Sequence, residues 1–512
     1  MDFHPEVFGI SESRTLASDL PMFVDGKFVG SAEGATTPLI NPATGRQLGR
    51  AAEASTNDVG AAVDAAHEVF VRGTWRQRPR KERAAVLHRL ADLIDEKREQ
   101  IFTLETLNNG RPIRETKAQL SILGDYYRYA ASVLLTHRDD VIPSDGGHHV
   151  YTLRSAMGVC AIITPFNHPM LILGQSLPFA LAAGNSVVVK PSELTPVTTV
   201  FLAALAVEAG LPPGVFNVVT GAASVATALV ADERVAKVNF TGGAGGGRAM
   251  VELTAGRPVK LTTELGGHSP VVVFEDADLD AAVCGVTFAS FIASGQTCVA
   301  ASRVLVQSSI YDQFLAELVA KARTLRLGDP TSAETDVGPV ISADRREALL
   351  RAMAQAEESG AVVISGGNAA VEVDGTTEGF FLEPVVVADV HPTMPIASEE
   401  VFGPFVVVMR FDDEQDAIEL ANRSRFALGA AVWTRDVGRA HRVAQAIESG
   451  ICWVNDHHRL EVSVPWGGHR ASGVGKEAGL EAFADFTNQR VVIVNNALQS
   501  SDWYGAGETR LN

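Results

Sequence analysis

Residues 158–191, GVCAIITPFNHPMLILGQSLPFALAAGNSVVVKP, decide the fold of this chain. The stretch begins and ends with short β-branched runs, at 159–163 and 186–189, and the apolar segment between them is long enough for a helix. No Asp, Glu, Lys or Arg occurs in residues 155–189, although three prolines and Gly184 interrupt the apolar pattern. We therefore predict a buried strand, a loop and a helix inside a large core, and not a membrane-spanning helix.

The same alternation of short strands and helical stretches continues along the chain. Further β-branched runs occur at 216–221, 236–242 and 269–276, and a helical stretch follows each of them. This alternation predicts a parallel sheet covered by helices. It resumes after residue 298 with the runs at 301–307 and 405–411, which indicates a second α/β unit.

Composition narrows the class of protein. The chain has 512 residues, of which 46% are hydrophobic and 20% charged, and this suits a globular protein with more than one domain. The net charge of -18 argues against nucleic acid or an anionic membrane as the main partner. Four unclustered cysteines make neither a disulfide framework nor a zinc site. The first ten residues have no basic start or long apolar run, so we expect no signal peptide and a cytoplasmic location.

The N-terminal part contains several local signals. Residues 1–20 read as a loose leader, and 22–29 read as two strands joined by a turn. A helix is predicted from Ser55, with Asp58 placed for a capping box. The apolar face of residues 80–104 predicts one long helix.

Two later segments predict strands outside the main sheets. Residues 138–156 break the helical pattern and read as a hairpin away from the core. Residues 487–495 read as a strand that is apolar on both sides and has no obvious partner nearby, a kind of strand that often pairs with another subunit. Residues 498–512 are expected to form a loose tail.

One cysteine differs from the other three in its surroundings. Cys298 lies in residues 291–303, FIASGQTCVAASR, where small and polar residues precede it on a predicted loop. Cys160, Cys284 and Cys452 lie in apolar runs, which favours the ordinary role of a small buried hydrophobe. The local pattern leaves both a nucleophile and a buried thiol open for Cys298.

Polar groups follow the ends of four predicted strands in the first α/β unit. They are Asn167, the pair Lys190 and Glu193, the glycine-rich turn 241–247, and Glu264. Because ligands in open α/β sheets bind at the carboxyl ends of strands, this pattern suits a nucleotide beside a reaction centre. The turn does not match G-x-G-x-x-G, so by itself it indicates either a phosphate-facing turn or simple close packing.

These residues resemble the NAD(P)-dependent aldehyde dehydrogenase superfamily over roughly residues 20–497. The matching motifs, in the order of that family, are PFNHP (165–169), KPSELTP (190–196), NFTGG (239–243), ELGGHSP (264–270), GQTC (295–298), EEVFGP (399–404) and PWGGHRASGVGKE (465–477). The Glu264 and Cys298 motifs together, in order and at the spacing of the family, are far more specific than either alone.

The resemblance implies a fold with three parts. A Rossmann-like NAD-binding domain would comprise 1–134 and 156–266, and an α/β catalytic domain would comprise 267–475. A small β oligomerisation unit would combine 135–155 with 476–497. Family members are typically homodimers or homotetramers, and the sequence does not decide between them.

The resemblance also implies a mechanism for oxidising a small-molecule aldehyde to the acid. Cys298 would attack the aldehyde as the thiolate, and Asn167 with the Cys298 N–H would stabilise the oxyanion of the thiohemiacetal. Hydride transfer would leave a thioester, which water activated by Glu264 would hydrolyse. Alternatives are a semialdehyde dehydrogenase for a carboxylated substrate, an enzyme that passes the acyl group to coenzyme A, and a non-catalytic relative. The presence of Glu264 favours hydrolysis.

The cofactor implied by the resemblance is NAD. Glu193 would accept hydrogen bonds from the ribose 2′-OH and repel a 2′-phosphate, whereas Lys190 would partly compensate, so NADP stays an alternative. Glu400 and Phe402 match the pair that positions the nicotinamide ribose and ring. The matching cofactor positions are Lys190, Glu193, Thr241, Gly242, Gly243, Gly247, Leu265, Glu400 and Phe402.

The substrate side departs from the family pattern. Phe166 and His168 stand where tryptophan and an apolar residue are common, which would reshape the substrate tunnel. Two interpretations are open for Arg459. It would anchor a substrate carboxylate, or it belongs to a loop that is solvated or lies between subunits, and we favour this second interpretation. His457 and His458 are adjacent and lack a carboxylate–histidine spacing, so we predict no metal site.

Overall fold

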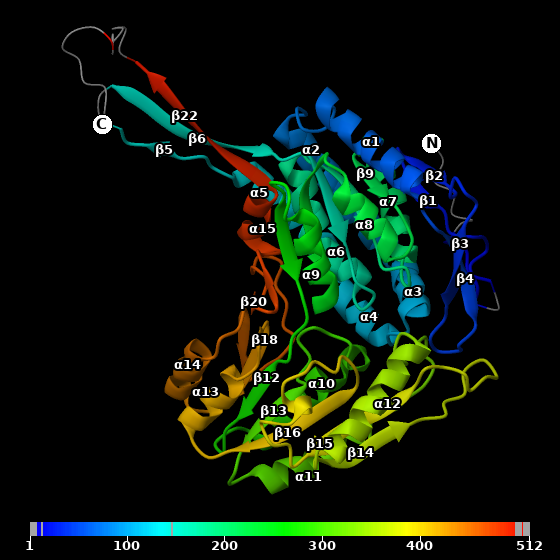
Figure 1. Ribbon diagram of the computed structural model, residues 1–512, viewed down its shortest axis with the longest axis vertical. Coiled ribbons are helices and arrows are strands. Elements are labelled where there is room, and N and C mark those ends of the chain that lie inside the picture. The colour runs from blue at the N-terminus through cyan, green and yellow to red at the C-terminus, as the bar shows by residue number, and fades with distance from the viewer. Residues whose placement is uncertain (1–7, 12–13, 145–146, 497–503, 505–512) are drawn as a thin grey trace.

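The computed structural model describes residues 8–11, 14–144, 147–496 and 504 (Figure 1). Two large sheets, each surrounded by helices, form the body of the molecule, and a thin arm of strands extends from the first of them (Figure 1). This arrangement confirms the predicted α/β fold with two units and a small β unit. The domain boundaries drawn from the sequence stay a prediction.

The first sheet has eight strands in the order β2-β1-β9-β8-β7-β10-β11-β21. The strands are β1 (Met22–Val24), β2 (Lys27–Val29), β7 (Val159–Ile163), β8 (Ser186–Lys190), β9 (Phe216–Val218), β10 (Val235–Thr241), β11 (Lys260–Glu264) and β21 (Gly473–Val474). Strands β9 to β11 in this order are parallel, and the flanking β1 and β21 are antiparallel to their neighbours. A smaller hairpin pairs β3 (Thr36–Ile40) with β4 (Gln47–Ala52).

The strand order places a topological switch between β7 and β10. The parallel part of the sheet starts at β7 and continues with β8 and β9 on one side of it. The chain then returns to the other side of β7, where it forms β10 and β11. The loops that leave β7 and β10 therefore diverge, and such a point is where open α/β sheets bind ligands. The polar strand ends predicted from the sequence lie at this place.

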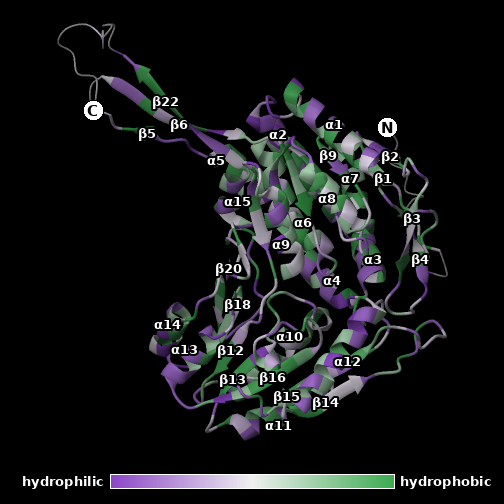
Figure 2. Ribbon diagram, viewed as in Figure 1, coloured by the Kyte–Doolittle hydropathy of each residue, from purple (hydrophilic) through white to green (hydrophobic). Residues whose placement is uncertain are grey.

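Helices surround the first sheet on both faces (Figure 1). They are α1 (Thr56–Arg72), α2 (Arg80–Glu96), α3 (Arg98–Asn109), α4 (Ile113–Leu120), α5 (Leu123–Thr136), α6 (Pro169–Ala183), α7 (Val197–Glu208), α8 (Ala223–Ala231), α9 (Ala244–Thr254) and α15 (Gly479–Asp485). Every residue of α6 is buried, which explains why this helix contains no charged side chain (Figure 2). Gly184 ends α6 at a φ of 95°, a left-handed conformation that glycine adopts without strain. Within the described part of the chain, no helix is both long and apolar enough to cross a membrane.

Two helix predictions had different outcomes. The capping box is confirmed, because the Ser55 hydroxyl accepts the Asp58 N–H and the Asp58 carboxylate accepts the Ser55 N–H. The single helix over 80–104 is wrong, because the chain breaks at Lys97 into α2 and α3. Lys97 leaves the helical conformation, with φ and ψ of -94° and 6°, and no glycine or proline marks that position in the sequence.

The second sheet has seven strands in the order β14-β15-β16-β13-β12-β18-β19. All are parallel except β14, which is antiparallel to β15. The strands are β12 (Pro270–Val273), β13 (Arg303–Gln307), β14 (Val362–Asn368), β15 (Leu382–Ala388), β16 (Phe405–Phe411), β18 (Gly429–Trp433) and β19 (Ile451–Val454). Its helices are α10 (Leu279–Phe291), α11 (Tyr311–Ala322), α12 (Ala343–Glu358), α13 (Glu414–Asn422) and α14 (Val437–Ala446), and β17 (Phe426–Ala427) pairs with β20 (His469–Arg470) beside it.

The projecting arm contains β5 (Val141–Ile142), β6 (His148–Ala156) and β22 (Thr487–Asn495) (Figure 1). The predicted hairpin is confirmed, because β5 pairs with β6. The late strand β22 does have a partner in its own chain: it pairs antiparallel with β6 along its full length. The predicted tail lies outside the described residues, apart from Tyr504.

The first segment of the chain is not a loose leader where it is described. Phe8 is buried and packs edge-to-face on Phe201, with ring centroids 5.0 Å apart. Leu16 and Leu20 are also buried, and Ile10 forms a bridge with Leu16. The segment lacks local periodicity, so only its tertiary contacts reveal that it is packed.

Candidate active site

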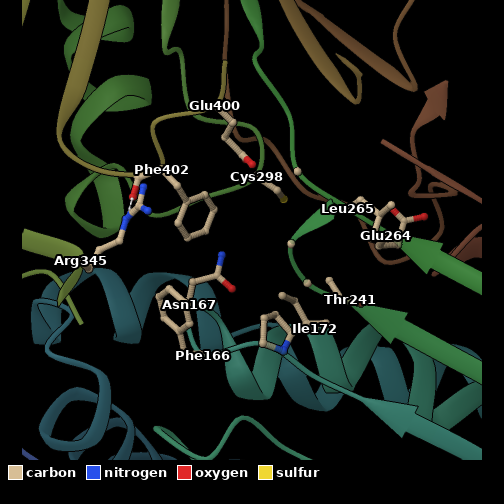
Figure 3. A pocket seen from close by; sticks show the side chains of 14 residues that line it. Phe166, Asn167, Ile172, Thr241, Glu264, Leu265, Cys298, Arg345, Glu400 and Phe402 are labelled. Carbon is tan, nitrogen blue, oxygen red and sulfur yellow. Dashed lines mark hydrogen bonds between the residues drawn. The ribbon is translucent and has the colours of Figure 1, made fainter. Parts of the chain in front are cut away.

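A cavity of about 250 Å³ opens at the switch point of the first sheet and reaches the loop that carries Cys298 (Figure 3). The predicted site residues on its wall are Asn167, Thr241, Gly242, Gly243, Glu264, Leu265, Cys298, Glu400 and Phe402. A smaller cavity, of about 40 Å³, lies on the other side of the cysteine and shares Ile172, Thr241, Glu264, Leu265 and Cys298 with the first. Cys298 therefore lies where the two cavities meet.

The backbone before Cys298 is strained. Ala293 and Ser294 have φ of 52° and 53°, a left-handed conformation that is unfavourable for residues with a side chain. Two hydrogen bonds to other parts of the chain hold this shape: the Glu115 carboxylate accepts the Ala293 N–H at 2.8 Å, and the Ser294 hydroxyl donates to the Gly338 carbonyl at 2.8 Å. Strain that is held in this way is characteristic of functional loops.

The surroundings of the Cys298 sulfur disfavour the thiolate. Burial, and then the carboxylates of Glu264 and Glu400, raise the pKa of Cys298 to about 12. The resting side chain is therefore a protonated thiol at neutral pH. A reaction that uses its sulfur as a nucleophile needs a base or a positive charge that arrives with the ligands.

Asn167 follows β7 and turns its amide toward the cysteine loop. Its Nδ2 donates a hydrogen bond of 2.9 Å to the Gln296 carbonyl, two residues before Cys298. Its Oδ1 is buried and accepts no hydrogen bond from the described part of the chain. Figure 3 shows the amide facing the same space as Cys298 and Phe402. An amide donor held there is suited to an oxygen atom bound to the carbon that the sulfur attacks.

Glu264 ends β11 and is almost completely buried, with 2% of its surface exposed. It is thus not the surface carboxylate that a strand end alone would suggest. Burial raises its pKa well above the usual value, and the neighbouring Glu477 raises it further. Among the described residues, neither carboxyl oxygen of Glu264 has a hydrogen-bond partner, although the charge of Lys476 and the nearby Gly468 N–H lower its pKa in part. A carboxyl group with a raised pKa is suited to proton transfer near neutral pH.

Glu400 and Phe402 form the opposite wall of the larger cavity (Figure 3). The Gly267 N–H donates to Glu400 at 3.0 Å, and burial raises the pKa of Glu400 to about 7. Phe402 has a φ of 51°, and its carbonyl accepts a hydrogen bond from Arg345 Nε at 3.0 Å. The ring of Phe166 packs edge-to-face on Phe402, with centroids 5.9 Å apart.

The remaining predicted cofactor residues lie outside the cavity wall. Lys190 is buried and its Nζ lies 3.3 Å from Glu193, whose side chain is 43% exposed. Gly247 packs against Leu265 so closely that an added Cβ would lie 2.5 Å from that side chain.

Gly243, on the wall of the larger cavity, is the N-cap of α9. There is open space around it, and no described side chain caps the first N–H groups of this helix. Such a helix end suits an anionic phosphate.

Several wall residues were not predicted as site residues. Arg345 and Ile172 line the larger cavity, and Glu477 lines the smaller one. Glu477 was part of a recognised motif, and its buried contact with Asn239, at 2.6 Å, comes from β10. Arg345 lies on α12 and carries no signal in its local sequence.

The interpretation of the loop that follows β19 needs correction. The loop that contains His457 and His458 is not solvated throughout, because His457 is buried and bonds to the Val299 carbonyl at 2.7 Å, and His458 lines the smaller cavity. Arg459 is different: its side chain is 71% exposed and pairs with Glu461.

Cys284 also departs from its prediction, because it is exposed on the outer face of α10, between buried residues of the same helix. Cys160 is buried as expected. Across the described ranges, no three His, Cys, Asp or Glu side chains are grouped so that they could hold a metal ion.

The geometry defines an α/β enzyme in which the ligand crevice of the first sheet and a half-buried cysteine share one cavity. Comparison with known proteins then identifies the family. The model of the Aldehyde dehydrogenase family matches residues 28–492, and the chain belongs to this family.

Two curated relatives and one solved structure illustrate the similarity. The chain is 38% identical to a betaine aldehyde dehydrogenase of Mesorhizobium japonicum and 39% identical to one of Cereibacter sphaeroides, in each case over 92% of this chain and 96% of the relative. The crystal structure of a Staphylococcus aureus betaine aldehyde dehydrogenase in complex with NAD+ matches with a TM-score of 0.92 and 34% identity, over 94% of this chain and 96% of that one. The protein is thus an NAD-dependent oxidoreductase that acts on an aldehyde.

Proposed function

We propose that Cys298 attacks the aldehyde carbon and that the Asn167 amide and the Cys298 N–H stabilise the oxygen of the resulting thiohemiacetal. The position of the sulfur at the meeting of the two cavities is the observation that carries this proposal. One oxyanion donor of this type contributes roughly 3–4 kcal/mol to the transition state. The NAD nicotinamide, in the larger cavity, supplies the chemistry of a hydride acceptor.

Glu264 would complete the reaction. After the carbon has lost hydride, the acyl group is bound to Cys298 as a thioester. Glu264 takes a proton from water, the water oxygen attacks the acyl carbon, and the carbon–sulfur bond breaks to release the carboxylic acid, while the proton passes from Glu264 to the Cys298 sulfur. The burial of Glu264 beside Glu477 supports this role, because the raised pKa makes it a stronger base than an exposed carboxylate.

The chain's residues fit NAD. The uncapped start of α9 and the open space at Gly243 suit its pyrophosphate. Glu400, held by the Gly267 N–H, suits a ribose hydroxyl. The pair Lys190 and Glu193 would hold the adenine-side ribose.

A panel of aldehydes tests this function. Initial rates of NADH formation are to be measured on aliphatic, aromatic, amino and carboxylated aldehydes, with and without coenzyme A. We expect turnover without coenzyme A, because water can reach the acyl group beside Glu264. Turnover that requires coenzyme A would overturn the hydrolytic step.

Glu193 should set the preference for NAD over NADP. We expect Glu193→Ala to raise the ratio of kcat/KM for NADP to kcat/KM for NAD by about 10-fold, since it removes a partly exposed negative charge from the position of a 2′-phosphate. Steady-state kinetics with both cofactors measures the ratio. Glu208→Ala, which changes an exposed carboxylate at the end of α7, is the matched control. An unchanged ratio in Glu193→Ala would remove Glu193 from the cofactor site.

The pKa of Cys298 should be visible in its alkylation. Without ligands, the rate of iodoacetamide modification of Cys298 should rise about 10-fold per pH unit from pH 7 to 10, because the thiolate fraction grows until the pH reaches a pKa near 12. Peptide mass spectrometry distinguishes Cys298 from the exposed Cys284, which serves as internal reference. A plateau near pH 8 would show that the site stabilises the thiolate.

The arm supports assembly into a homodimer or homotetramer. Its strands expose apolar side chains (Val141, Ile142, Leu153, Val491, Ile493). We expect Ile493→Lys to lower the mass measured by light scattering, because a buried charge in an interface is unfavourable. Val437→Lys, on an exposed apolar residue of α14, should leave the mass unchanged.

A reducing cytoplasm is the location that best suits the described cysteines, all of which are free.

A further inference from the structure

We propose that the smaller cavity selects short aldehydes that carry a neutral hydrogen-bonding group, such as a hydroxyl or an amide, over alkyl, carboxylated or quaternary ammonium aldehydes. The proposal rests on the proposed role of Cys298, because it assigns this cavity to the part of the substrate beyond the reacting carbon. Its wall lies between the cysteine and the loop that follows β19.

Most of the surface of this cavity is apolar, but neutral polar side chains also line it. They include His168, Gln175, Thr297 and His458. His168 Nδ1 and His458 Nε2 are both buried and have no hydrogen-bond partner within the described protein. Buried polar atoms are nearly always satisfied in folded proteins, so two unsatisfied ring nitrogens on one small cavity point to a ligand that supplies the missing partner.

Both histidines are uncharged at neutral pH. Burial lowers the pKa of His168 and of His458 well below the usual value, and the nearby positive charge of Arg111 lowers both further. A neutral imidazole has one donor and one acceptor nitrogen. A hydroxyl or an amide also offers both functions, and it pairs with such a ring without any change of charge.

The acidic groups around the cavity oppose an anionic substrate. Glu264 and Glu477 lie on its wall, and a substrate carboxylate would be close to both. Arg111 does not compensate, since it already lies 3.6 Å from Glu105 and 3.9 Å from Glu115, and its Nη2 donates to Gln119. Arg111 is therefore already paired, and the other charged groups at the cavity, Glu264 and Glu477, are acidic.

A quaternary ammonium group would also be poorly matched. Such cations are recognised by several aromatic faces that surround them. Trp466 is the one indole or phenyl ring on the described wall, and the aliphatic side chains there are Leu171, Ile172, Leu265, Val299 and Leu460. The chain therefore lacks an aromatic cage in this cavity.

The volume limits the length of the substrate. The cavity measures about 40 Å³ on a scale where one water needs roughly 10–15 Å³. It thus accommodates about three water-sized groups, which corresponds to a short chain beyond the aldehyde carbon.

Pairs of aldehydes that differ in one group test the proposal. The decisive pair is 3-hydroxybutanal and 3-methylbutanal, which differ only by hydroxyl against methyl. We expect kcat/KM with saturating NAD to favour 3-hydroxybutanal by at least about 10-fold, because a methyl group leaves the ring nitrogens of His168 and His458 unpaired. Succinic semialdehyde and betaine aldehyde, the substrate named for the curated relatives, represent the two charged classes and should both be slower.

Variants connect the preference to the two rings. His168→Phe and His458→Phe keep a planar ring but remove its nitrogens, and each should bring the hydroxyl-to-methyl ratio close to one. His441→Phe, on an exposed face of α14, should leave the ratio unchanged. If a variant does not fold, the wild-type ratios still decide the question.

The outcomes separate the two proposals. Equal or faster turnover of 3-methylbutanal, or a preference for succinic semialdehyde or betaine aldehyde, would overturn the substrate class while the oxidation of aldehydes stands. No NADH from any of the four aldehydes would instead count against the proposed role of Cys298.

Discussion

Cys298→Ala is expected to lower the rate of NADH formation by at least about 10⁴-fold, because the covalent intermediate cannot form without the sulfur. The substitution removes one atom at the meeting of the two cavities and leaves the α9 turn intact. NAD affinity, measured by calorimetry, should therefore change by less than about 3-fold. The two measurements together separate loss of chemistry from loss of folding.

The chain provides a matched control for this experiment. Cys284→Ala removes an exposed thiol from α10 and should retain full activity. Residual activity of Cys298→Ala within 100-fold of wild type would show that the cysteine is not the nucleophile.

Glu264→Gln is expected to slow steady-state turnover by about 10²–10⁴-fold while the first turnover still produces NADH. Glutamine keeps the shape of the buried side chain but cannot accept a proton from water, so the acyl group should remain on Cys298. A rapid-mixing experiment should show a burst of about one NADH per active site, and mass spectrometry should detect the acylated cysteine.

The wild-type enzyme should show the corresponding pH dependence. Since Glu264 has a raised pKa, its basic form increases with pH, and the rate of deacylation should rise over the same range. Glu461→Gln is the control: it changes an exposed carboxylate in the loop that follows β19 and should show no burst. If Glu264→Gln showed neither a burst nor an acyl adduct, Glu264 would act before hydride transfer.

Local sequence patterns predicted the parts of the fold that depend on neighbours in the chain. The strand–helix–strand unit at 158–191, the capping box at Ser55 and the glycine turn before α9 all follow from residues a few positions apart. The resemblance then connected Cys298 with Glu264, and the structure brings both to one cavity.

Features that depend on distant contacts were not predictable in this way. The break at Lys97 and the packing of Phe8 on Phe201 have no local sign in the sequence. Because histidine is polar, His457 and His458 were expected to lie in solvent. His457 instead bonds to the Val299 carbonyl, next to Cys298, and His458 lines the smaller cavity. Periodicity cannot show which polar side chains are enclosed when the enclosing wall comes from another part of the chain.

The carboxylates around Cys298 have a consequence for survival of the enzyme under oxidative stress. Peroxides attack the thiolate and react slowly with a protonated thiol. Because burial and these carboxylates raise the pKa of Cys298, we expect the enzyme without ligands to be oxidised more slowly than a protein with an exposed cysteine of low pKa. The surroundings that keep the thiol protonated before an aldehyde arrives would in this way also limit its oxidation.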